Sequence, residues 1–160
     1  MTGPSEGSLV AATLLTGLDA GIMLAFANSV MPGLRGATDD AFVDVMVGIN
    51  EQIQNPLFFA IFIGGPMSQG VALALRGGWG PATGLLVSGV MASLAKLALT
   101  AVLHVPANTA LATSGRRPGA ATAGLRSAFE TRWVSWHRVR TALSVTAFLA
   151  TAATAWASAP

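Results

Sequence analysis

The chain has 160 residues, of which 52% are hydrophobic and only 10% are charged. A soluble domain carries about 25% charged residues, and a single core in so short a chain cannot bury this much apolar surface. The composition therefore argues against an ordinary soluble domain and predicts an integral membrane protein. The formal net charge of +2 gives little support to a nucleic-acid partner, and the absence of cysteine excludes disulfides and thiolate chemistry.

Four apolar stretches have the ~20-residue length that crosses the hydrocarbon core of a bilayer. They cover residues 8–30, 56–75, 82–105 and 139–157. Because lipid offers no hydrogen-bond partners to the backbone, we predict that all four are helices. Met31-Pro32-Gly33 is expected to close the first stretch and Pro106 the third. The sequence thus predicts an all-α fold, a four-helix membrane bundle that forms a single domain over residues 1–160.

The segments between the spans carry further signals. Residues 38–55 begin with a plausible N-cap, Thr38, and repeat apolar side chains at helical spacing, which predicts an interfacial amphipathic helix that ends at Asn55-Pro56. Residues 115–119 are expected to form a turn, followed by a short helix leading into residues 129–133. The first eight residues contain no Lys or Arg, so we expect no cleaved signal peptide.

The distribution of arginine predicts the orientation in the membrane. Six arginines lie between the third and fourth spans or at their junction: Arg116, Arg117, Arg126, Arg132, Arg138 and Arg140. By the positive-inside rule this connection is cytoplasmic. Four spans then place the first connection on the same side and both termini outside. The first connection has a formal charge of −3 and the third +5, so we expect the two connections to attract each other.

Two charged residues lie inside predicted spans. Lys96 is the only lysine of the chain, and Asp19 lies at a similar depth in the first span. A buried charge is costly in a membrane, so we predict that the two side chains face the bundle interior and pair. Their role is open between a structural ion pair that fixes helix register and a part in substrate or proton handling.

Other candidate residues cluster near the cytoplasmic ends of the spans. His104 and His137 could meet Glu130 there, and such a group would suit a divalent metal, although two interfacial histidines without a metal are the more ordinary interpretation. Trp133 and Trp136 fit an interfacial aromatic belt, or a surface on which a flat aromatic substrate stacks. Gly64-Gly65-Pro66 predicts a kink in the second span, with close helix packing favoured over a backbone-lined cavity.

Four short motifs in succession are typical of one family. They are Met31-Pro32-Gly33-Leu34, then Ile49-Asn50-x-x-Ile53-x-Asn55-Pro56-x-Phe58, then His104-Val105-Pro106-x-Asn108-x-x-Leu111, and finally Phe129-Glu130-x-x-Trp133-x-x-Trp136-His137-x-Val139-Arg140. In their order and spacing, over about residues 15–155, they resemble the anthrone oxygenase family of small four-helix membrane proteins. The sequence departs from the family pattern at His137, where Asn often stands.

The resemblance implies a membrane oxygenase that converts a lipophilic, aromatic, polyketide-type anthrone to a quinone in secondary metabolism. It implies dioxygen as co-substrate and no required flavin or haem. The residues carried over from the motifs are Asn50, Asn55, His104, Asn108, Glu130, Trp133 and Arg140; His137 joins them as a candidate catalytic residue. Trp133, Trp136, Lys96 and Asp19 are candidate substrate-binding residues, and His104, His137 and Glu130 are the ligands if a divalent metal is present.

Other functions remain open at this stage. A metal-dependent membrane oxidoreductase, a transporter that uses Lys96 and Asp19, and a non-catalytic membrane subunit would each suit parts of the sequence. In every case the expected partners are the lipid bilayer and a hydrophobic small molecule, with a homo-oligomer as a further option and no nucleic acid. The expected location is a multi-pass protein of the bacterial inner (plasma) membrane, with both long connections cytoplasmic.

Overall fold

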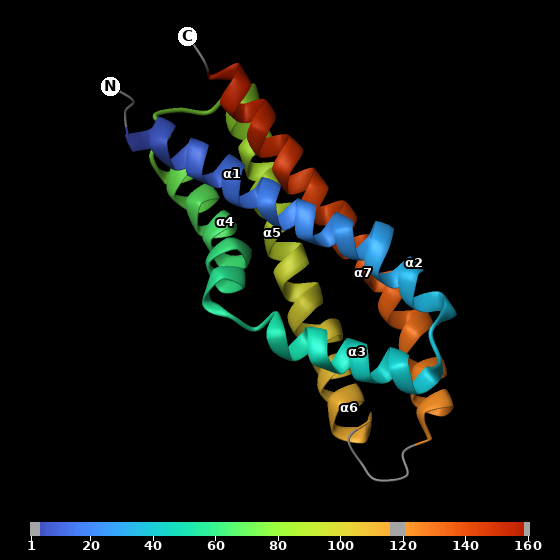
Figure 1. The fold of residues 1–160 in the computed structure, drawn as a ribbon. Coiled ribbons are helices and arrows are strands. Elements are labelled where there is room, and N and C mark those ends of the chain that lie inside the picture. The colour runs from blue at the N-terminus through green and yellow to red at the C-terminus, as the bar shows by residue number, and fades with distance from the viewer. Residues whose placement is uncertain (1–3, 116–120, 159–160) are drawn as a thin grey trace.

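The computed structural model describes residues 4–115 and 121–158, and every regular element in these two ranges is helical (Figure 1). The elements are α1 (Pro4–Ala25), the π-helical turn η1 (Phe26–Val30), α2 (Met31–Gly33), the 3₁₀ turn η2 (Leu34–Gly36), α3 (Asp39–Gln52), α4 (Pro56–Ala74), α5 (Pro81–Leu99), the π-helical turn η3 (Thr100–His104), α6 (Val105–Gly115) and α7 (Thr122–Ala157). The predicted all-α fold is confirmed.

The long helices pack side by side and place the two long connections at one end of the molecule. Helix α1 packs against α4 and α7, and α5 packs against α7 and α4. In Figure 1 the start of α1 and the end of α7 lie together at one end, whereas α3, α6 and the start of α7 gather at the other. This arrangement brings together the elements that carry most of the sequence motifs.

Three helices of the described chain are long and apolar enough to cross a membrane: Ser5–Gly36, Pro56–Ala74 and Pro81–Gly115. Large apolar side chains on them point outward, including Leu14, Leu57 and Val102 at 64%, 71% and 69% exposure. A soluble protein would not leave so many exposed. The fourth predicted span, 139–157, lies within α7 and does not reach the same apolar character, because Arg140 lies in it and threonine and serine recur along it.

The chain passes both prolines in helical conformation: the first helix ends close to the predicted Met31-Pro32-Gly33, with α2 ending at Gly33 and η2 at Gly36, whereas Pro106 does not end the third, which continues to Gly115. Pro32 and Pro106 both follow a π-helical turn, η1 and η3, with one residue between. In each turn a backbone N–H bonds five residues back, from Met31 to the Phe26 carbonyl and from Val105 to the Thr100 carbonyl. A proline has no N–H and clashes with the carbonyl four residues earlier, so the wider turn lets the helix pass the ring. The third helix therefore continues beyond the membrane-length segment.

The third connection is also more helical than predicted. Helix α6 extends to Gly115, and α7 runs without interruption from Thr122 to Ala157, so residues 129–133 belong to one long helix and not to a separate short one. Residues 116–120, most of the predicted turn, lie outside the described residues. The continuity of α7 matters for the site, because it holds Trp133, His137 and Arg140 on a single rigid element.

Helix α3 covers the end of the molecule, as its amphipathic pattern predicts, but it packs on protein. The Thr38 side chain accepts a hydrogen bond from the Ala41 backbone N–H, which confirms the predicted N-cap. Phe42 and Met46 are fully buried, in a cluster with Leu111 of α6 and Trp133 of α7. The apolar face of α3 is thus satisfied by α6 and α7, and this helix closes one end of the interior.

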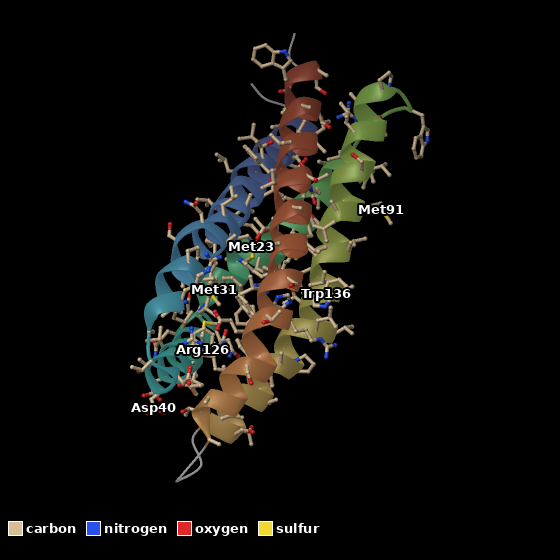
Figure 2. The ribbon with its side chains drawn as sticks, turned by 90° about the vertical axis from the view of Figure 1, so that its right-hand side faces the viewer. Met23, Met31, Asp40, Met91, Arg126 and Trp136 are labelled. Carbon is tan, nitrogen blue, oxygen red and sulfur yellow. The ribbon has the colours of Figure 1, made fainter. Side chains whose placement is uncertain are left out.

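Arg126 of α7 ties this cover to the bundle (Figure 2). Its guanidinium donates to the backbone carbonyls of Leu34, Arg35 and Ala37, at 2.7 to 3.3 Å, and pairs with Asp39 at 3.2 Å. The predicted attraction between the acidic first connection and the arginine-rich third is confirmed by this pair. The hydrogen bond to Glu130 and the attraction of its carboxylate, followed by the same two interactions with Asp39, raise the pKa of Arg126 above its ordinary value, so the arginine stays charged.

Close packing between α1 and α4 depends on the glycines before Pro66. Helix α4 continues through Pro66. A Cβ atom at Gly65 would stand 3.2 Å from Cγ2 of Thr16 on α1, and one at Gly64 would stand 3.2 Å from Leu15. The glycine pair therefore serves the approach of two helices, the packing interpretation of this motif.

Gly65→Leu should separate α1 from α4 and lower the stability of the fold. Overpacking of this kind costs about 1–3 kcal/mol. Gly70→Leu, on the same helix, is the matched control because a Cβ there meets nothing within 4 Å. Thermal unfolding followed by circular dichroism in detergent measures both. Equal melting temperatures for the two variants would contradict the packing role of Gly65.

Candidate functional site

A cavity of about 390 Å³, which we call the interior cavity, lies where α1, η1, α3, α4, η3, α6 and α7 meet. A volume in this range accommodates a drug-sized small molecule. Its walls include the aromatic side chains of Phe26, Phe58, Phe59, Phe62 and Trp133, and its rim includes the exposed residues Glu51, Phe59 and Val105. Four of the predicted catalytic residues also line it: Asn50, His104, Asn108 and Arg140. The structure therefore brings together, in one apolar chamber, residues that are far apart in the sequence.

A directed chain of hydrogen bonds leads into the cavity. The indole N–H of Trp133 donates to Oδ1 of Asn108 at 2.8 Å. Because an indole nitrogen can only donate, it fixes the orientation of the Asn108 amide, whose nitrogen then donates to Oδ1 of Asn50 at 3.0 Å. The amide nitrogen of Asn50 is left buried and without a partner among the described residues. It is a hydrogen-bond donor held ready for a ligand.

His104 is buried at 2% exposure, and its ring has no hydrogen bond of good geometry within the described chain. The ring packs edge-on against Trp133, with centroids 5.2 Å apart. It is the last residue of η3, so the π-helical turn sets the direction in which the ring leaves the helix. A buried imidazole with no partner of good geometry is costly unless a ligand or water completes it, so His104 is available to a ligand.

His137, in contrast, is fully engaged. Its Nε2 lies 3.1 Å from the backbone oxygen of Met23, and its Nδ1 lies 2.9 Å from Nη2 of Arg140. A carbonyl oxygen only accepts and a guanidinium only donates, so Nε2 carries the proton and Nδ1 is the acceptor. The ring is a neutral, fixed tautomer that stacks on Trp133 with centroids 4.8 Å apart. His137 is placed to hold Arg140 and Trp133, with no free nitrogen for a substrate.

The buried charged side chains of the described chain carry a net positive charge. Lys96 pairs with Asp19 at 3.0 Å, which confirms the predicted ion pair, and Arg140 adds a second buried cation that Asp19 also attracts. Two cations and one carboxylate leave a formal charge of +1. Arg140 lines the cavity, and its Nε has no partner in the described part of the chain, whereas the carboxylate of Glu51 lines the same cavity at its exposed rim. An anion in the cavity would balance this charge.

The remaining predicted residues lie outside this cavity. Asn55 is exposed, and its side chain caps α4 by accepting from the Phe58 backbone N–H. Glu130 pairs with Arg126 at 2.8 Å and borders a smaller pocket between α2 and α7. Trp136 is 40% exposed and lies on the α5–α7 side of the molecule (Figure 2). The Lys96–Asp19 pair lies behind Phe62, with Nζ of Lys96 3.9 Å from its ring centroid.

The donor set does not fit the divalent metal that the sequence left open. No group of three or more His, Asp or Glu side chains in the described ranges could hold a metal ion. The rings of His104 and His137 have centroids 6.3 Å apart, and both nitrogens of His137 are already used. Glu130 is directed to Arg126 instead. A single free imidazole is too few ligands for a metal site.

Sequence reasoning missed the aromatic wall and the backbone partner of His137. Phe58, Phe59 and Phe62 open α4 and line the cavity, and their spacing of one, three and four residues was a signal that could have placed them on one helix face. The carbonyl of Met23 has no signature in the side-chain sequence. Only the packing of α1 against α7 makes it a partner of His137.

Comparison with known proteins agrees with this geometry. The sequence profile of the anthrone oxygenase family matches residues 45–150. The chain belongs to the anthrone oxygenase family. The match contains the second half of α3, all of α4, α5, η3 and α6, and most of α7. No curated protein and no solved structure matches the chain.

Removing one member of the Lys96–Asp19 pair should destabilise the fold strongly, whereas replacing both members with apolar residues should cost much less. Lys96→Met leaves a buried carboxylate unpaired, and the expected loss is about 3–5 kcal/mol of unfolding free energy. The Lys96→Met/Asp19→Leu double variant should recover most of it. Denaturant unfolding in detergent measures the cycle. Turnover of the refolded double variant then separates the two roles left open: full activity indicates a structural pair, and lost activity indicates a part in the chemistry.

Proposed function

We propose that this protein is a membrane oxygenase of secondary metabolism that oxidises a lipophilic polycyclic phenol of the anthrone class to a quinone with dioxygen. The observation that carries the proposal is the convergence of a free imidazole, a free amide donor and a buried guanidinium on one aromatic-walled cavity. Membership of the anthrone oxygenase family supports the reaction class. The proposal needs no organic cofactor, because an electron-rich carbanion can itself react with dioxygen.

The cavity suits a flat, acidic, aromatic substrate for two reasons. Phe26, Phe58 and Phe62 offer faces and edges against which fused rings stack. At the buried end of the cavity, Arg140 favours the anion that forms when such a substrate loses a proton, whereas the one carboxylate of the lining, Glu51, lies at the exposed rim. A neutral aliphatic lipid would gain from neither feature.

The reaction begins with proton transfer to His104. Its free imidazole takes a proton from the methylene carbon between the rings, and the electron pair moves to the ketone oxygen as an enolate. The unpartnered amide N–H of Asn50 and the guanidinium of Arg140 are the groups that stabilise this oxygen.

Dioxygen then completes the oxidation. The carbanion passes its electrons to O₂, a carbon–oxygen bond forms, and the peroxide anion recovers the proton from imidazolium His104. Removal of the second methylene proton by His104 expels hydroxide as the O–O bond breaks, and the hydroxide takes that proton as water. One anthrone and one O₂ give one quinone and one water, so the imidazole returns to its starting state.

His104→Ala should lower the turnover of 1,8-dihydroxyanthrone by about 10²–10⁴, the usual contribution of a general base. Asn50→Ala should cost about 10²–10³ through loss of an enolate donor. Asn55→Ala is the control, because Asn55 caps α4 outside the cavity. The assay follows oxygen uptake and quinone absorbance by purified protein in nanodiscs. Full activity of a folded His104→Ala variant rules out the proposed base.

We further propose that the protein crosses the membrane four times. Residues 139–157 of α7 form the fourth span, and the α3–α6 end lies in the bacterial cytoplasm. The six arginines of the third connection support this orientation. The contacts of α7 with α1 and α5 support its position inside the bundle. The cavity then lies near the cytoplasmic face, with its hydrophobic walls at membrane depth.

Reporter fusions test this orientation. A phosphatase reporter, which is active only outside the cytoplasm, should be inactive when fused after Gly115 and active after Ser158. Green fluorescent protein should show the reverse pattern. The matched position is the α4–α5 connection at Gly78, which the proposal places outside. An active phosphatase after Gly115 would invert the topology.

A second candidate, ion or proton transport, is favoured by one observation. Buried polar side chains continue from the Lys96–Asp19 pair toward the other end of the bundle: Gln69 donates to Thr151 at 2.7 Å and accepts from Ser93 at 2.7 Å. These groups satisfy one another, as interhelical hydrogen bonds in membranes do. Proton flux into liposomes that survives loss of His104 but not of Gln69 would support transport over oxidation.

A further inference from the structure

A second cavity, again of about 390 Å³, lies on the other side of His104 and Trp133. We call it the seam cavity, because it runs between η3 and α6 on one side and the first half of α7 on the other, lined among others by Ala110, Ala128 and Trp136. His104 and Trp133 line both this cavity and the interior one. The candidate base and its stacking partner therefore form the partition between two chambers.

The two chambers differ in chemistry. The interior cavity contains the amide, guanidinium and hydroxyl groups that could handle a developing charge, including Asn50 and Arg140. Apart from His104 and the indole of Trp133, the polar side chains that line the seam cavity are Arg132 and Ser114. Its walls are otherwise apolar and aromatic, with Phe129 and Trp136 beside Trp133. Such a site binds fused aromatic rings and does little to activate them.

The seam is also placed to receive a molecule from the membrane. Val102 lines the seam cavity at 69% exposure, on a helix that is long and apolar enough to span the bilayer. Trp136, 40% exposed, lies at the same seam between α7 and the α5–α6 helix, on the face that Figure 2 shows. Tryptophan favours the interfacial depth of a bilayer. The cavity is thus open where lipophilic phenols accumulate.

Of the two side chains that separate the cavities, Trp133 is held in place and His104 is not. Trp133 is held by its hydrogen bond to Asn108 and by stacking on His137. His104 has no hydrogen bond of comparable geometry in the described chain, and only weaker contacts with the backbone of Leu99 and Trp133 oppose rotation of its side chain. From this asymmetry we propose that the seam cavity is the lateral entry site for the flat aromatic substrate, which passes from the bilayer to the interior cavity when the His104 ring turns aside. This inference rests on the proposed function for the identity of the substrate.

The aromatic lining favours this occupant over a lipid chain. An acyl chain gains only apolar burial, whereas a planar phenol also gains stacking on Trp133 and Trp136. Arg132 provides a cation for an ionised phenol or a carboxylate. A lipid chain that occupies the same space is an alternative outcome of the test below.

Plugging the seam should slow substrate entry without changing the chemistry. Ala110→Trp and Ala128→Trp place an indole in the cavity from α6 and α7 respectively. Ala142→Trp, an exposed position on α7 that lines neither cavity, is the matched control. For 1,8-dihydroxyanthrone we expect kcat/KM to fall about tenfold in both plugged variants, with kcat at saturation retained. Wild-type kinetics in both variants overturns the proposal.

A binding experiment tests the site independently of turnover. Since the chain has no cysteine, Ala128→Cys supplies a single thiol in the seam and Ala142→Cys a single thiol outside it. Under anaerobic conditions, 1,8-dihydroxyanthrone should protect the first thiol from N-ethylmaleimide and leave the second reactive. Protection of Ala128→Cys by palmitate instead of by the phenol identifies a lipid site and overturns the proposal.

The two experiments together separate the possible failures. Protection without any oxidation of the phenol by wild-type protein refutes the proposed reaction and leaves an aromatic-binding seam. Oxidation without protection refutes the seam as a binding site and leaves the reaction. Protection and oxidation with unchanged kcat/KM in the plugged variants show a binding site off the reaction path, which also overturns the entry role.

Discussion

The interior of this protein is organised by the need to compensate charges placed among apolar helices. Lys96 and Asp19 neutralise each other across α5 and α1, and Arg140 of α7 adds a cation that Asp19 alone does not balance. Three helices are thereby fixed in relation to one another around a site of excess positive charge. Such an arrangement is costly in an empty protein and favourable once an anion is bound. The proposed enolate is an anion of this kind. The same buried positive charge that destabilises the empty protein would therefore stabilise the enolate.

We assign the two histidines different roles because their surroundings differ. His137 is held between the Met23 carbonyl and Arg140, so its tautomer is fixed and it orients the guanidinium and the stacked Trp133. His104 lacks such partners in the described chain and is the group able to accept a proton. The family resemblance gives all the motif residues the same weight, whereas the geometry distinguishes the residues that line the cavity from those that hold other residues in place. His137 acts through other groups, and Asn55 and Glu130 stabilise the helix ends and the cover of the bundle.

The sequence predicted the helical class, the Thr38 cap and the Lys96–Asp19 pair because each follows from a local rule about burial or capping. It misplaced the end of the third span's helix, because a proline usually stops a helix and no sequence rule showed that η3 would carry the chain past Pro106. Asn50, Asn108, His104 and Arg140 do line one cavity, but His104 and Arg140 lie within continuous helices and not at the helix ends from which their closeness was predicted. Which imidazole or amide nitrogen lacks a hydrogen-bond partner depends on long-range contacts with residues such as Met23 and Trp133. Spacing along the chain does not reveal these contacts.

The π-helical turn at Thr100–His104 makes the length of this segment as important as its residues. An α-helix advances about 100° per residue, so one residue more or fewer between Lys96 and His104 changes the angular phase between them by about 100°. Deleting a single alanine or valine there would restore a regular helix and keep every side chain that the site uses. It would also turn the imidazole and the buried lysine away from their common interior. Within this family, a one-residue gap ahead of the histidine therefore reports a change of geometry that no list of conserved residues would record.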